Sequence, residues 1–397
     1  MHNGKALFIT PVLPDAGGGG LAKRAHQWLE QLSRSWDVHV LAIPAQDRRA
    51  RAIPIESRAQ PGERVLYYGK PAGRLPSDLL GWRSASKDDA AFLAATYSGM
   101  RFAKIVCFRS YLVDIALCAQ RLTQCPSLEV DMDDVESDAR RSIARLAWLR
   151  GRWKKALLMT ASSAFFRLKE RQLGRRIAQL YVCSEEDAAL LMRRSSAWQV
   201  KVLPNRLSIR TAPHPLPLPP AQQRRSLLFV GTLDYYPNEE AVRWVVKHLL
   251  PRLRSGGRER WTFHVAGFGG SPALLRQLRE ADGVIFHGSV EQVRPLYAAA
   301  AIAVAPLRAG GGTKLKVLEA MGFGRPVIAS KEGVRGLKLE NGTHYFHAET
   351  AEQYAQACER LAEEDAVYAA LVHAARALLE AHYVYGTRQP AADCKAT

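Results

Sequence analysis

Cysteine is scarce in this sequence, and the few that occur are scattered. The 397 residues include six cysteines, which are Cys107, Cys118, Cys125, Cys183, Cys358 and Cys394. None forms a C-x-x-C pair or lies near a histidine at metal-ligand spacing, so we expect no zinc site. Scattered cysteines in a long chain are typical of reduced thiols in a cytosolic protein.

Long hydrophobic runs are missing as well. The N-terminus, MHNGKALFITPVLP, has only a short apolar run before a Thr-Pro break, which is too short for the core of a signal peptide. The longest apolar stretch, LYAAAAIAVAPL (296–307), is too short to span a bilayer. We therefore expect a cytoplasmic protein that could touch the inner face of the membrane without crossing it.

Acidic residues are outnumbered by basic ones. The chain has 38 Asp and Glu against 56 Lys and Arg, which gives a formal net charge of +18 at pH 7. A protein this basic is expected to bind an anionic partner, and nucleic acid, an acidic membrane surface and phosphorylated small molecules all qualify.

Several familiar motifs are also absent from the sequence. There is no G-x-S-x-G elbow, no Walker pattern G-x-x-x-x-G-K-[ST] and no G-x-G-x-x-G. The histidines His26, His264 and His287 are each isolated in sequence, and isolated histidines are more often structural, so none receives a role.

Short apolar runs alternating with helical patterns are present along most of the chain. Examples are KALFIT (5–10), KIVCF (104–108) and IAVAPL (302–307), each followed by a segment with helical spacing of apolar residues. Strands separated by helices predict a parallel sheet covered by helices on both faces. The predicted fold class is therefore α/β, with doubly wound Rossmann-like domains.

The chain length and a change in composition predict two such domains. A chain of 397 residues is too long for one core, and residues 205–226 are rich in proline and lack periodicity. We predict an N-terminal domain over 1–204, a linker over 205–226 and a C-terminal domain over 227–364. The final helix, over 365–390, could pack back on the first domain. Ligands of such sheets bind beyond the carboxyl ends of the strands, so a cleft between facing domains is the expected site.

The segment PLRAGGGTKLKVLEAM (306–321) predicts a strand-to-helix turn that binds an anion. Thr313 is a candidate N-cap, and the glycines allow a ligand to approach the backbone closely. Free amides at the helix start attract phosphate, and Lys314 and Lys316 add positive charge. Glu319 could accept from a pair of sugar hydroxyls. The alternative is a flexible glycine turn with solvated lysines, but a second glycine run, PDAGGGGLAKRA (14–25), follows the first strand in the same way.

These segments resemble those of a known family. PLRAGGGTKLKVLEAMGFGRPVIAS is similar to the donor-site signature of the retaining, nucleotide-sugar-dependent glycosyltransferases of family four, which have the GT-B fold with two Rossmann-like domains. LLFVGTLDYYPNEEAVRWVVKHLLP (227–251) and GSVEQVRPLYAAAAIAVAPL (288–307) resemble the parts of the donor domain that precede it. VDMDDVES (130–137) and YVCSEEDAALL (181–191) resemble a bacterial surface-polysaccharide branch.

The resemblance implies a role for each matching residue. The amides of Thr313, Lys314 and Leu315 would hold the distal phosphate, and Glu319 would bind the ribose hydroxyls. From the first domain, the glycine run would lie near the diphosphate. The donor-binding set that follows is Gly19, Gly20, Gly231, Thr232, Asn238, Arg308, Gly311, Gly312, Thr313, Lys314, Leu315 and Glu319.

Three positions depart from the family pattern. The family often has a glutamate where this chain has Gly311, and backbone amides of the glycine run could replace it. Many members carry an Arg and a Lys where this chain has Thr232 and Asn238, so the missing charge is expected from Lys314 or Arg308. The histidine that commonly ends an acceptor-domain strand is absent from VDMDD (130–134).

The acids of this last segment are candidates for catalysis. Asp131, Asp133 or Asp134 could orient the acceptor or receive its proton, and Arg109, at another strand end, could touch the donor or an anionic acceptor. We assign Asp131, Asp134 and Arg109 as the catalytic set. One Asp could instead cap the next helix, and Arg109 could form a surface ion pair. A D-x-D metal site is the less favoured alternative, and no metal or other cofactor is expected.

Residues 140–176 form the most basic stretch, with aromatic residues interleaved and Glu170 as their one acid. Basic helices with aromatics suit an anionic membrane interface, and RNA binding lacks a supporting signature. A solvated helix face with core aromatics is the alternative. The predicted membrane or acceptor patch is Arg152, Trp153, Lys154 and Lys155.

Together the observations favour a retaining glycosyltransferase that moves a hexose from a UDP- or GDP-linked donor to a glycan. The expected acceptor is linked to a polyprenyl diphosphate in bacterial surface-polysaccharide synthesis, at a peripheral membrane location and without nucleic acid. A nucleotide-sugar epimerase or hydrolase of the same fold, and a non-catalytic polyanion-binding module, are the alternatives.

Overall fold

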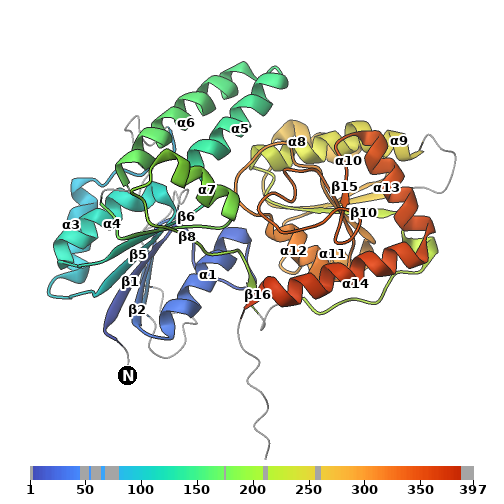
Figure 1. Cartoon of the computed structure of the whole chain (residues 1–397). Helices are drawn as coiled ribbons and strands as arrows, with labels where there is room; N and C mark the ends of the chain where they lie inside the picture. The colour runs from blue at the N-terminus through green and yellow to red at the C-terminus, as the bar shows by residue number, and fades with distance from the viewer. Residues whose placement is uncertain are drawn as a thin grey trace, which may run out of the picture. The chain divides into compact units, whose positions relative to one another are not determined.

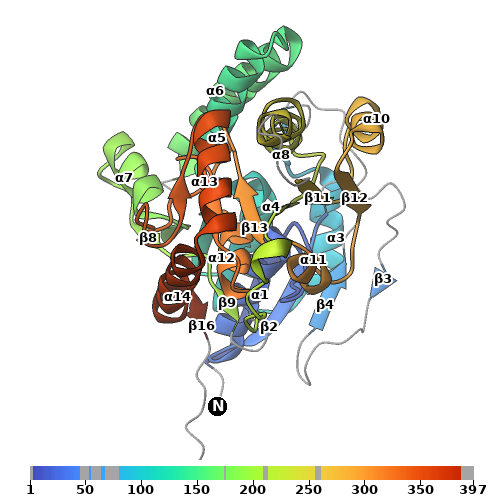
Figure 2. The same cartoon turned by 90° about the vertical axis from the view of Figure 1, so that its right-hand side faces the viewer.

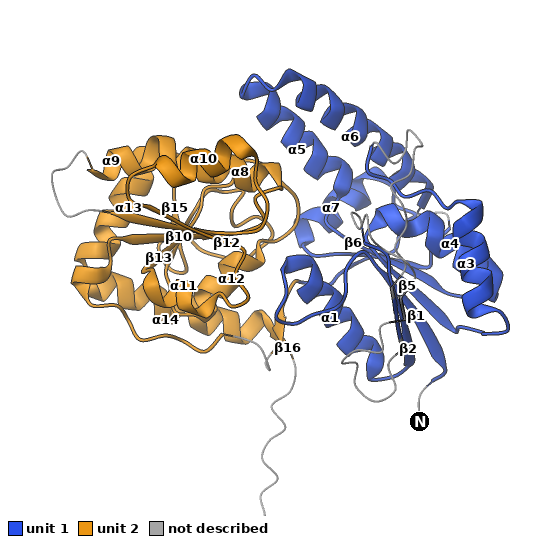
Figure 3. Ribbon diagram, turned by 180° about the vertical axis from the view of Figure 1, so that it is seen from behind, with its two compact units in different colours: residues 1–204 blue, residues 205–397 orange. Residues whose placement is uncertain are grey.

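The computed structural model describes residues 3–44, 53–54, 64–67, 80–173, 176–208, 213–254 and 261–385. The chain divides into two compact units, Met1–Pro204 (unit 1) and Asn205–Thr397 (unit 2), coloured separately in Figure 3. Each unit has a sheet and hydrophobic clusters of its own. The five cysteines in the described part of the chain are free and buried, while Cys394 lies outside it.

Unit 1 is built on an eight-stranded sheet. Its strands are β1 (Lys5–Thr10), β2 (Asp37–Ala42), β3 (Ile53–Pro54), β4 (Arg64–Tyr67), β5 (Lys104–Phe108), β6 (Leu128–Asp133), β7 (Gln179–Val182) and β8 (Val200–Val202). They lie in the order β3-β4-β2-β1-β5-β6-β7-β8, and only β3 runs antiparallel to its neighbour. The strand order reverses between β1 and β5, which is where doubly wound sheets bind ligands at the carboxyl ends of their strands.

Helices cover this sheet, and two of them extend beyond it. They are α1 (Gly20–Ser33), α3 (Lys87–Tyr97), α4 (Val113–Thr123), α5 (Glu136–Leu149), α6 (Trp153–Leu173) and α7 (Glu185–Arg194), with a short 3₁₀ turn at Ser110–Leu112. Helices α5 and α6 form an antiparallel hairpin whose tip projects from the rest of unit 1 (Figures 1 and 2). The strands in the centre of the sheet are almost fully buried, as expected when both faces are covered.

Unit 2 repeats this architecture. Its sheet contains β10 (Ser226–Val230), β11 (Thr262–Ala266), β12 (Val284–Gly288), β13 (Ile302–Ala305), β14 (Val327–Ala329) and β15 (Phe346–His347). The order is β12-β11-β10-β13-β14-β15, all parallel, which is the strand order of a dinucleotide-binding Rossmann sheet. A separate parallel pair joins β9 (Leu207–Ser208) to β16 (Val384–Tyr385).

The helices of unit 2 lie on both faces of its sheet. They are α8 (Tyr236–Trp244), α9 (Leu250–Arg254), α10 (Pro272–Glu280), α11 (Arg294–Ala299), α12 (Leu315–Gly322), α13 (Ala351–Glu363) and α14 (Asp365–His382), with a π segment at Val245–Leu249 and a 3₁₀ turn at Ala221–Gln223. Side chains of α14 join the hydrophobic clusters of unit 2. The last helix therefore belongs to unit 2, where the sequence had allowed a return to the first domain.

The described part of the proline-rich segment is fixed to unit 2. Arg376 Nη1 donates to the carbonyl oxygen of Pro213 at 2.8 Å, and Arg325 Nη1 donates to that of Pro217 at 3.1 Å. The amide of Leu216 donates to the carbonyl oxygen of Phe323 at 3.0 Å. Proline carbonyls accept hydrogen bonds as well as any others, so a segment without periodicity is still held in place here.

Local sequence explains where several helices begin. Ser86 and Thr350 form capping boxes at α3 and α13, and Ser184 and Ser271 cap α7 and α10 through their hydroxyl groups.

The α/β class and the two Rossmann-like folds predicted from the strand–helix alternation are confirmed. The short strands β3, β9, β15 and β16 were not predicted.

Candidate functional site

In unit 2, the turn between β13 and α12 carries the glycine-rich segment. Lys314 is the residue that precedes α12, and it makes no side-chain cap. The Oγ1 atom of Thr313 accepts a hydrogen bond from Nδ2 of Asn205 at 2.7 Å. The prediction that Thr313 caps the helix is therefore wrong, because its hydroxyl fastens the turn to the start of the unit. Gly310 and Gly312 have φ of 124° and 62°, a region that favours glycine.

Lys314 holds this turn together. Its Nζ atom donates to the carbonyl oxygens of Gly311 at 2.8 Å and Gly312 at 2.7 Å, and it lies 3.8 Å from a carboxylate oxygen of Glu332. The side chain is almost completely buried. The predicted source of charge for a ligand is thus engaged in shaping the loop that would hold one.

Lys316 is the cation at the carboxyl end of β10. Its Nζ atom donates to Oδ1 of Asn238 at 2.8 Å and lies 3.9 Å above the centre of the Phe229 ring. Asn238 in turn donates to the carbonyl oxygen of Thr232 at 2.8 Å. A β-carbon on Gly231 would lie 2.7 Å from the lysine nitrogen, so a larger residue there would displace the Lys316 side chain. Positions 232 and 238 carry no basic residue, and the cation next to them is Lys316 of α12.

The surroundings of Lys316 change its acidity. Burial and the neighbouring charge of Lys314 lower the pKa of its ammonium to about 7, although Glu319 acts in the opposite direction. Glu319 is itself buried, on the same helix. An ammonium with such a pKa keeps its proton more readily when an anion lies beside it.

The remaining predicted donor residues lie around the same strand ends. Gly311, Gly312 and Leu315 belong to the turn and the first residue of α12. Arg308 is exposed and stacks on Trp244, with its guanidinium carbon 5.2 Å from the ring centre. A β-carbon on Gly310 would meet the Tyr235 hydroxyl at 2.8 Å, so the loops after β10 and β13 lie side by side. The sequence found these loops but missed the pairing of Lys316 with Asn238.

In unit 1, the second glycine run forms the turn before α1. Gly19 is the N-cap of α1 and Gly20 is its first residue, so the amides of the first turn are available to an anion. Asp15 accepts from the amide of Gly17 at 2.8 Å and shapes the turn. A β-carbon on Gly18 would lie 2.8 Å from that of Ala22, which is closer than side chains approach.

The carboxylate of Asp131 is paired with side chains of α1. Both of its carboxylate oxygens accept from Arg24, at 2.7 and 2.8 Å, and Trp28 Nε1 donates to one of them at 2.5 Å. Asp131 is completely buried and Arg24 almost so. The assignment of Asp131 to the catalytic set is corrected, because a fully buried carboxylate with these partners is closed to an acceptor.

Arg109 and Asp134 form a second, more accessible group. Arg109 Nη1 lies 3.1 Å from Asp133 and 2.9 Å from Asp134, and its Nη2 pairs with Glu136. Arg109 and Asp133 both have positive φ, 77° and 64°, at the carboxyl ends of β5 and β6. Strained residues at strand ends are common at functional sites, which supports Arg109 as an acceptor-side residue. Asp134 stays in this hypothesis through its ion pair with Arg109.

The predicted membrane patch lies at the tip of the α5–α6 hairpin. Arg152, Trp153, Lys154 and Lys155 are all exposed, and Lys154 Nζ lies 5.3 Å from the Trp153 ring centre. The exposed fractions of Trp148 and Leu149 are 67% and 71%, and that of Trp153 is 58%. These aromatics and leucines are not core. Within the described ranges, none of the helices is both long and apolar enough to cross a membrane.

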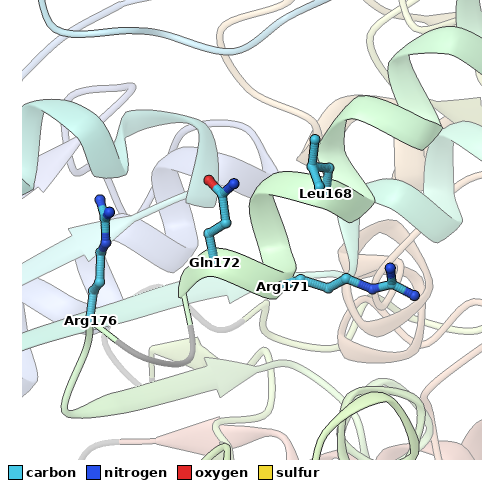
Figure 4. Close-up of a pocket in the computed structure, with 4 residues that line it drawn as sticks. All are labelled: Leu168, Arg171, Gln172 and Arg176. Carbon is cyan, nitrogen blue, oxygen red and sulfur yellow. The ribbon is translucent and has the colours of Figure 1, made fainter.

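Two further features were not anticipated. His264 Nδ1 and His287 Nε2, on β11 and β12, lie 3.0 Å apart, and burial lowers the pKa of both rings. A hollow at the end of α6 is lined by Leu168, Arg171, Gln172 and Arg176, but the side chains of the two arginines point in different directions (Figure 4). Over the part of the chain that the structure describes, no group of three or more His, Cys, Asp or Glu could hold a metal.

Comparison with known proteins gives this arrangement a class. The chain is similar to sucrose-phosphate synthase from Thermosynechococcus elongatus, with 17% identity, 96% of this chain and 95% of that chain covered, and a TM-score of 0.71. It is similar to Anabaena HepE in complex with UDP and glucose, with 15% identity, 96% and 95% covered, and a TM-score of 0.64. It is also similar to the E. coli trehalose-6-phosphate structure bound with UDP-2-fluoro glucose, with 11% identity, 95% of this chain and 95% of that chain covered, and a TM-score of 0.65. No curated protein sequence matches significantly.

The fold is therefore that of the GT-B glycosyltransferases. Residues 224–364 match the family model of glycosyl transferases group 1, so the candidate site of unit 2 lies inside the matched region. The similarity to glycosyltransferases is thus carried by the fold of the chain and by the family match within its second unit.

Proposed function

We propose that the protein is a retaining glycosyltransferase that takes a hexose from a nucleotide-sugar donor held in unit 2. The observation that carries this proposal is the convergence of the glycine turn, Lys316 and Glu319 at the carboxyl ends of β10 and β13. Strand ends at a switch point, a buried cation and a buried acid together suit a nucleoside diphosphate.

Each part of this site has a chemical task in the proposal. The amides at the start of α12 and the Lys316 ammonium neutralise the diphosphate, which carries the charge that develops when the sugar leaves. Glu319 accepts from the ribose hydroxyls. Positioning and phosphate stabilisation supply the catalysis, and we propose that no metal is required. Arg109 and Asp134 are the acceptor-side residues in unit 1.

The donor base is proposed to be uracil. HepE is described with UDP and glucose, and the E. coli structure with UDP-2-fluoro glucose, and both resemble this chain along nearly its whole length. Identity with both proteins is low, so GDP remains the comparison arm of the experiment.

The acceptor is proposed to be a glycan on a lipid diphosphate at the inner face of the membrane, in surface-polysaccharide synthesis. Support comes from the hairpin tip, where exposed Trp148, Leu149 and Trp153 lie beside Arg152 and Lys155. Apolar and basic side chains that share an exposed tip match the interface of an anionic bilayer.

Thermal unfolding with UDP, GDP, ADP and CMP, each with and without EDTA, tests the donor site. A ligand at about 100 times its dissociation constant stabilises by about 2.7 kcal/mol, which raises the midpoint by a few degrees. We expect one nucleotide to raise the unfolding midpoint equally with and without EDTA. We expect Glu319→Ala to abolish this rise. The exposed acid Glu340 provides the matched control, Glu340→Ala, which should keep it.

The same experiment has a clear failing outcome. If no nucleotide moves the transition, or if Glu340→Ala removes the shift as fully as Glu319→Ala, the donor site is not where we place it. Salt-sensitive polyanion binding without nucleotide would then be the better account of the net charge of +18.

A further inference from the structure

A groove runs between the two helices of the hairpin in unit 1. It has a volume of about 630 Å³ and is lined by side chains of α5 and α6. Its larger lining residues are Arg141, Arg145, Trp148, Leu157, Thr160 and Arg167. Trp148 also belongs to the exposed hairpin tip, whereas the other five were assigned neither to the donor site, nor to the acceptor site, nor to the tip.

The spacing of these residues builds the groove. Arg141, Arg145 and Trp148 are four and three residues apart, so they share one face of α5. On α6, Leu157 and Arg167 are ten residues apart, which is close to three turns, and they also share a face. Between the helices the lining residues are mainly alanines, and their small side chains leave the hollow open.

The described residues provide no carboxylate partner for the charge of the groove. None of the guanidinium groups of Arg141, Arg145 and Arg167 forms an ion pair with a carboxylate in the described residues. Other arginines of this region are neutralised, since Arg140 pairs with Glu136 and Arg194 with Glu170 at 2.8 Å. Three like charges around one hollow repel one another, so an anion between them would be stabilised.

The groove is apolar as well as basic. Trp148 and Leu157 are exposed by 67% and 58% and line it next to the arginines. A free inorganic anion would use only the arginines, whereas a lipid phosphate would use both kinds of surface. The groove also adjoins the hairpin tip, which carries the exposed side chains that suit a bilayer.

We propose that this groove binds the phosphate headgroup of a membrane lipid, with the guanidinium groups on the phosphate and the hydrocarbon chain along Trp148 and Leu157. Planar guanidinium groups match phosphate oxygens in pairs, which makes arginine well suited to such a site. The inference rests on the proposed membrane function, but its residues are distinct from those of the donor site.

Calorimetric titration of the full chain with dihexanoyl phosphatidic acid, below its micelle concentration, tests the inference. We expect saturable binding, at least tenfold tighter than that of dihexanoyl phosphatidylcholine or inorganic phosphate. The triple variant R141Q/R145Q/R167Q should lose at least tenfold in affinity. A matched variant, K87Q/R101Q/R193Q, removes the same charge from exposed sites away from the hairpin and should bind as the parent does.

Several results would overturn the inference. Equal losses in the two triple variants would show that net charge alone attracts the lipid. Equal binding of inorganic phosphate or of phosphatidylcholine would show that the basic and the apolar side chains of the groove do not act together. Displacement of the lipid by a single-stranded RNA oligonucleotide at similar concentration would favour a nucleic-acid surface.

Nucleotide-induced stabilisation of the same samples separates this inference from the proposed function. If nucleotide still stabilises the chain but the lipid does not bind, the groove inference alone fails. If the lipid binds but no nucleotide stabilises the chain, the donor-site proposal alone fails. The nucleotide shift also reports that the arginine variants are folded.

Discussion

At the scale of single residues, the altered acidity of Lys316 bears most directly on the proposed donor site. A lysine in water is charged far above neutral pH, but burial and Lys314 lower the pKa of Lys316 to about 7. The amine therefore loses its proton within the working range of most assays. A bound diphosphate would restore the charge, because an anion stabilises the protonated form.

This predicts that nucleotide-sugar binding depends on pH. The free protein releases the Lys316 proton as the pH rises through about 7, while the complex keeps it, so affinity falls above that pH. Since one proton is taken up, the loss approaches about tenfold per pH unit. Affinity measured by calorimetry between about pH 6 and pH 8.5 checks it.

Two variants control this prediction. Lys316→Arg keeps a charge that does not titrate in this range and should flatten the profile, while Lys316→Met should bind weakly at every pH. A parent profile that is flat across the range, or an equal slope in Lys316→Met, would show that another group is responsible.

Asp131 gives the second prediction at this scale, which concerns stability. Asp131→Asn leaves the buried Arg24 guanidinium without its anion, and breaking such a pair costs about 3–5 kcal/mol. On the same strand, Glu129 pairs with the partly exposed Lys104, so Glu129→Gln should cost about 1 kcal/mol or less. Urea unfolding of both variants compares them, and equal losses would refute the structural role of Asp131.

The sequence predicted some of these residues and could not predict others. Glu319 and the glycine turn lie in one continuous segment with helical spacing, so local pattern was enough to find them. The contact of Lys316 with Asn238 joins residues 78 positions apart and depends on two strands being neighbours. The assignment of Asp131 to the catalytic set failed for a similar reason, because the environment of its carboxylate depends on Arg24, 107 positions away.

At the scale of elements, the α5–α6 hairpin is the most exposed apolar surface of unit 1. Its tip presents Trp148, Leu149 and Trp153, and transfer of such a side chain out of water contributes about 1.5–3 kcal/mol. We predict that Leu149→Ser with Trp153→Ser lowers binding to phosphatidylglycerol vesicles by at least about tenfold. Binding of the parent should weaken with salt, as the basic neighbours are screened.

The matched control removes exposed apolar residues elsewhere in unit 1. Leu122→Ser with Met192→Ser alters side chains exposed by 46% and 51%, on α4 and α7. Co-sedimentation with vesicles should be unchanged in this pair. A similar loss in both pairs, or in neither, would remove the hairpin tip as the docking element.

The hairpin also shows where prediction by element stops. Its basic and aromatic composition was visible in the sequence, but composition does not separate a core aromatic from an exposed one. Phe166 is fully buried, whereas Trp153, on the same helix, is 58% exposed. That difference comes from the tip projecting beyond the sheet, which no local pattern records (Figures 1 and 2).

At the scale of the whole molecule, alternation of strand and helix was enough to predict two Rossmann-like folds. Buried parallel strands such as β1, β5 and β13 are short continuous apolar runs, and these are easy to find. The two-residue strands β3, β9 and β16 contain too little pattern. Residues 205–226 were predicted as a linker because they are rich in proline and lack periodicity. That pattern does not reveal the hydrogen bonds that the Pro217 and Pro213 carbonyls accept from Arg325 and Arg376.

The smallest of these strand pairs has a consequence for the architecture of unit 2. Leu207 lies beside Val384 and Ser208 beside Tyr385, so the first and the last described strands of unit 2 are neighbours. Neighbouring strands are only about 5 Å apart. Because these two strands lie together, another unit with the same paired strands could take the place of unit 2 without any change to the fold of unit 1.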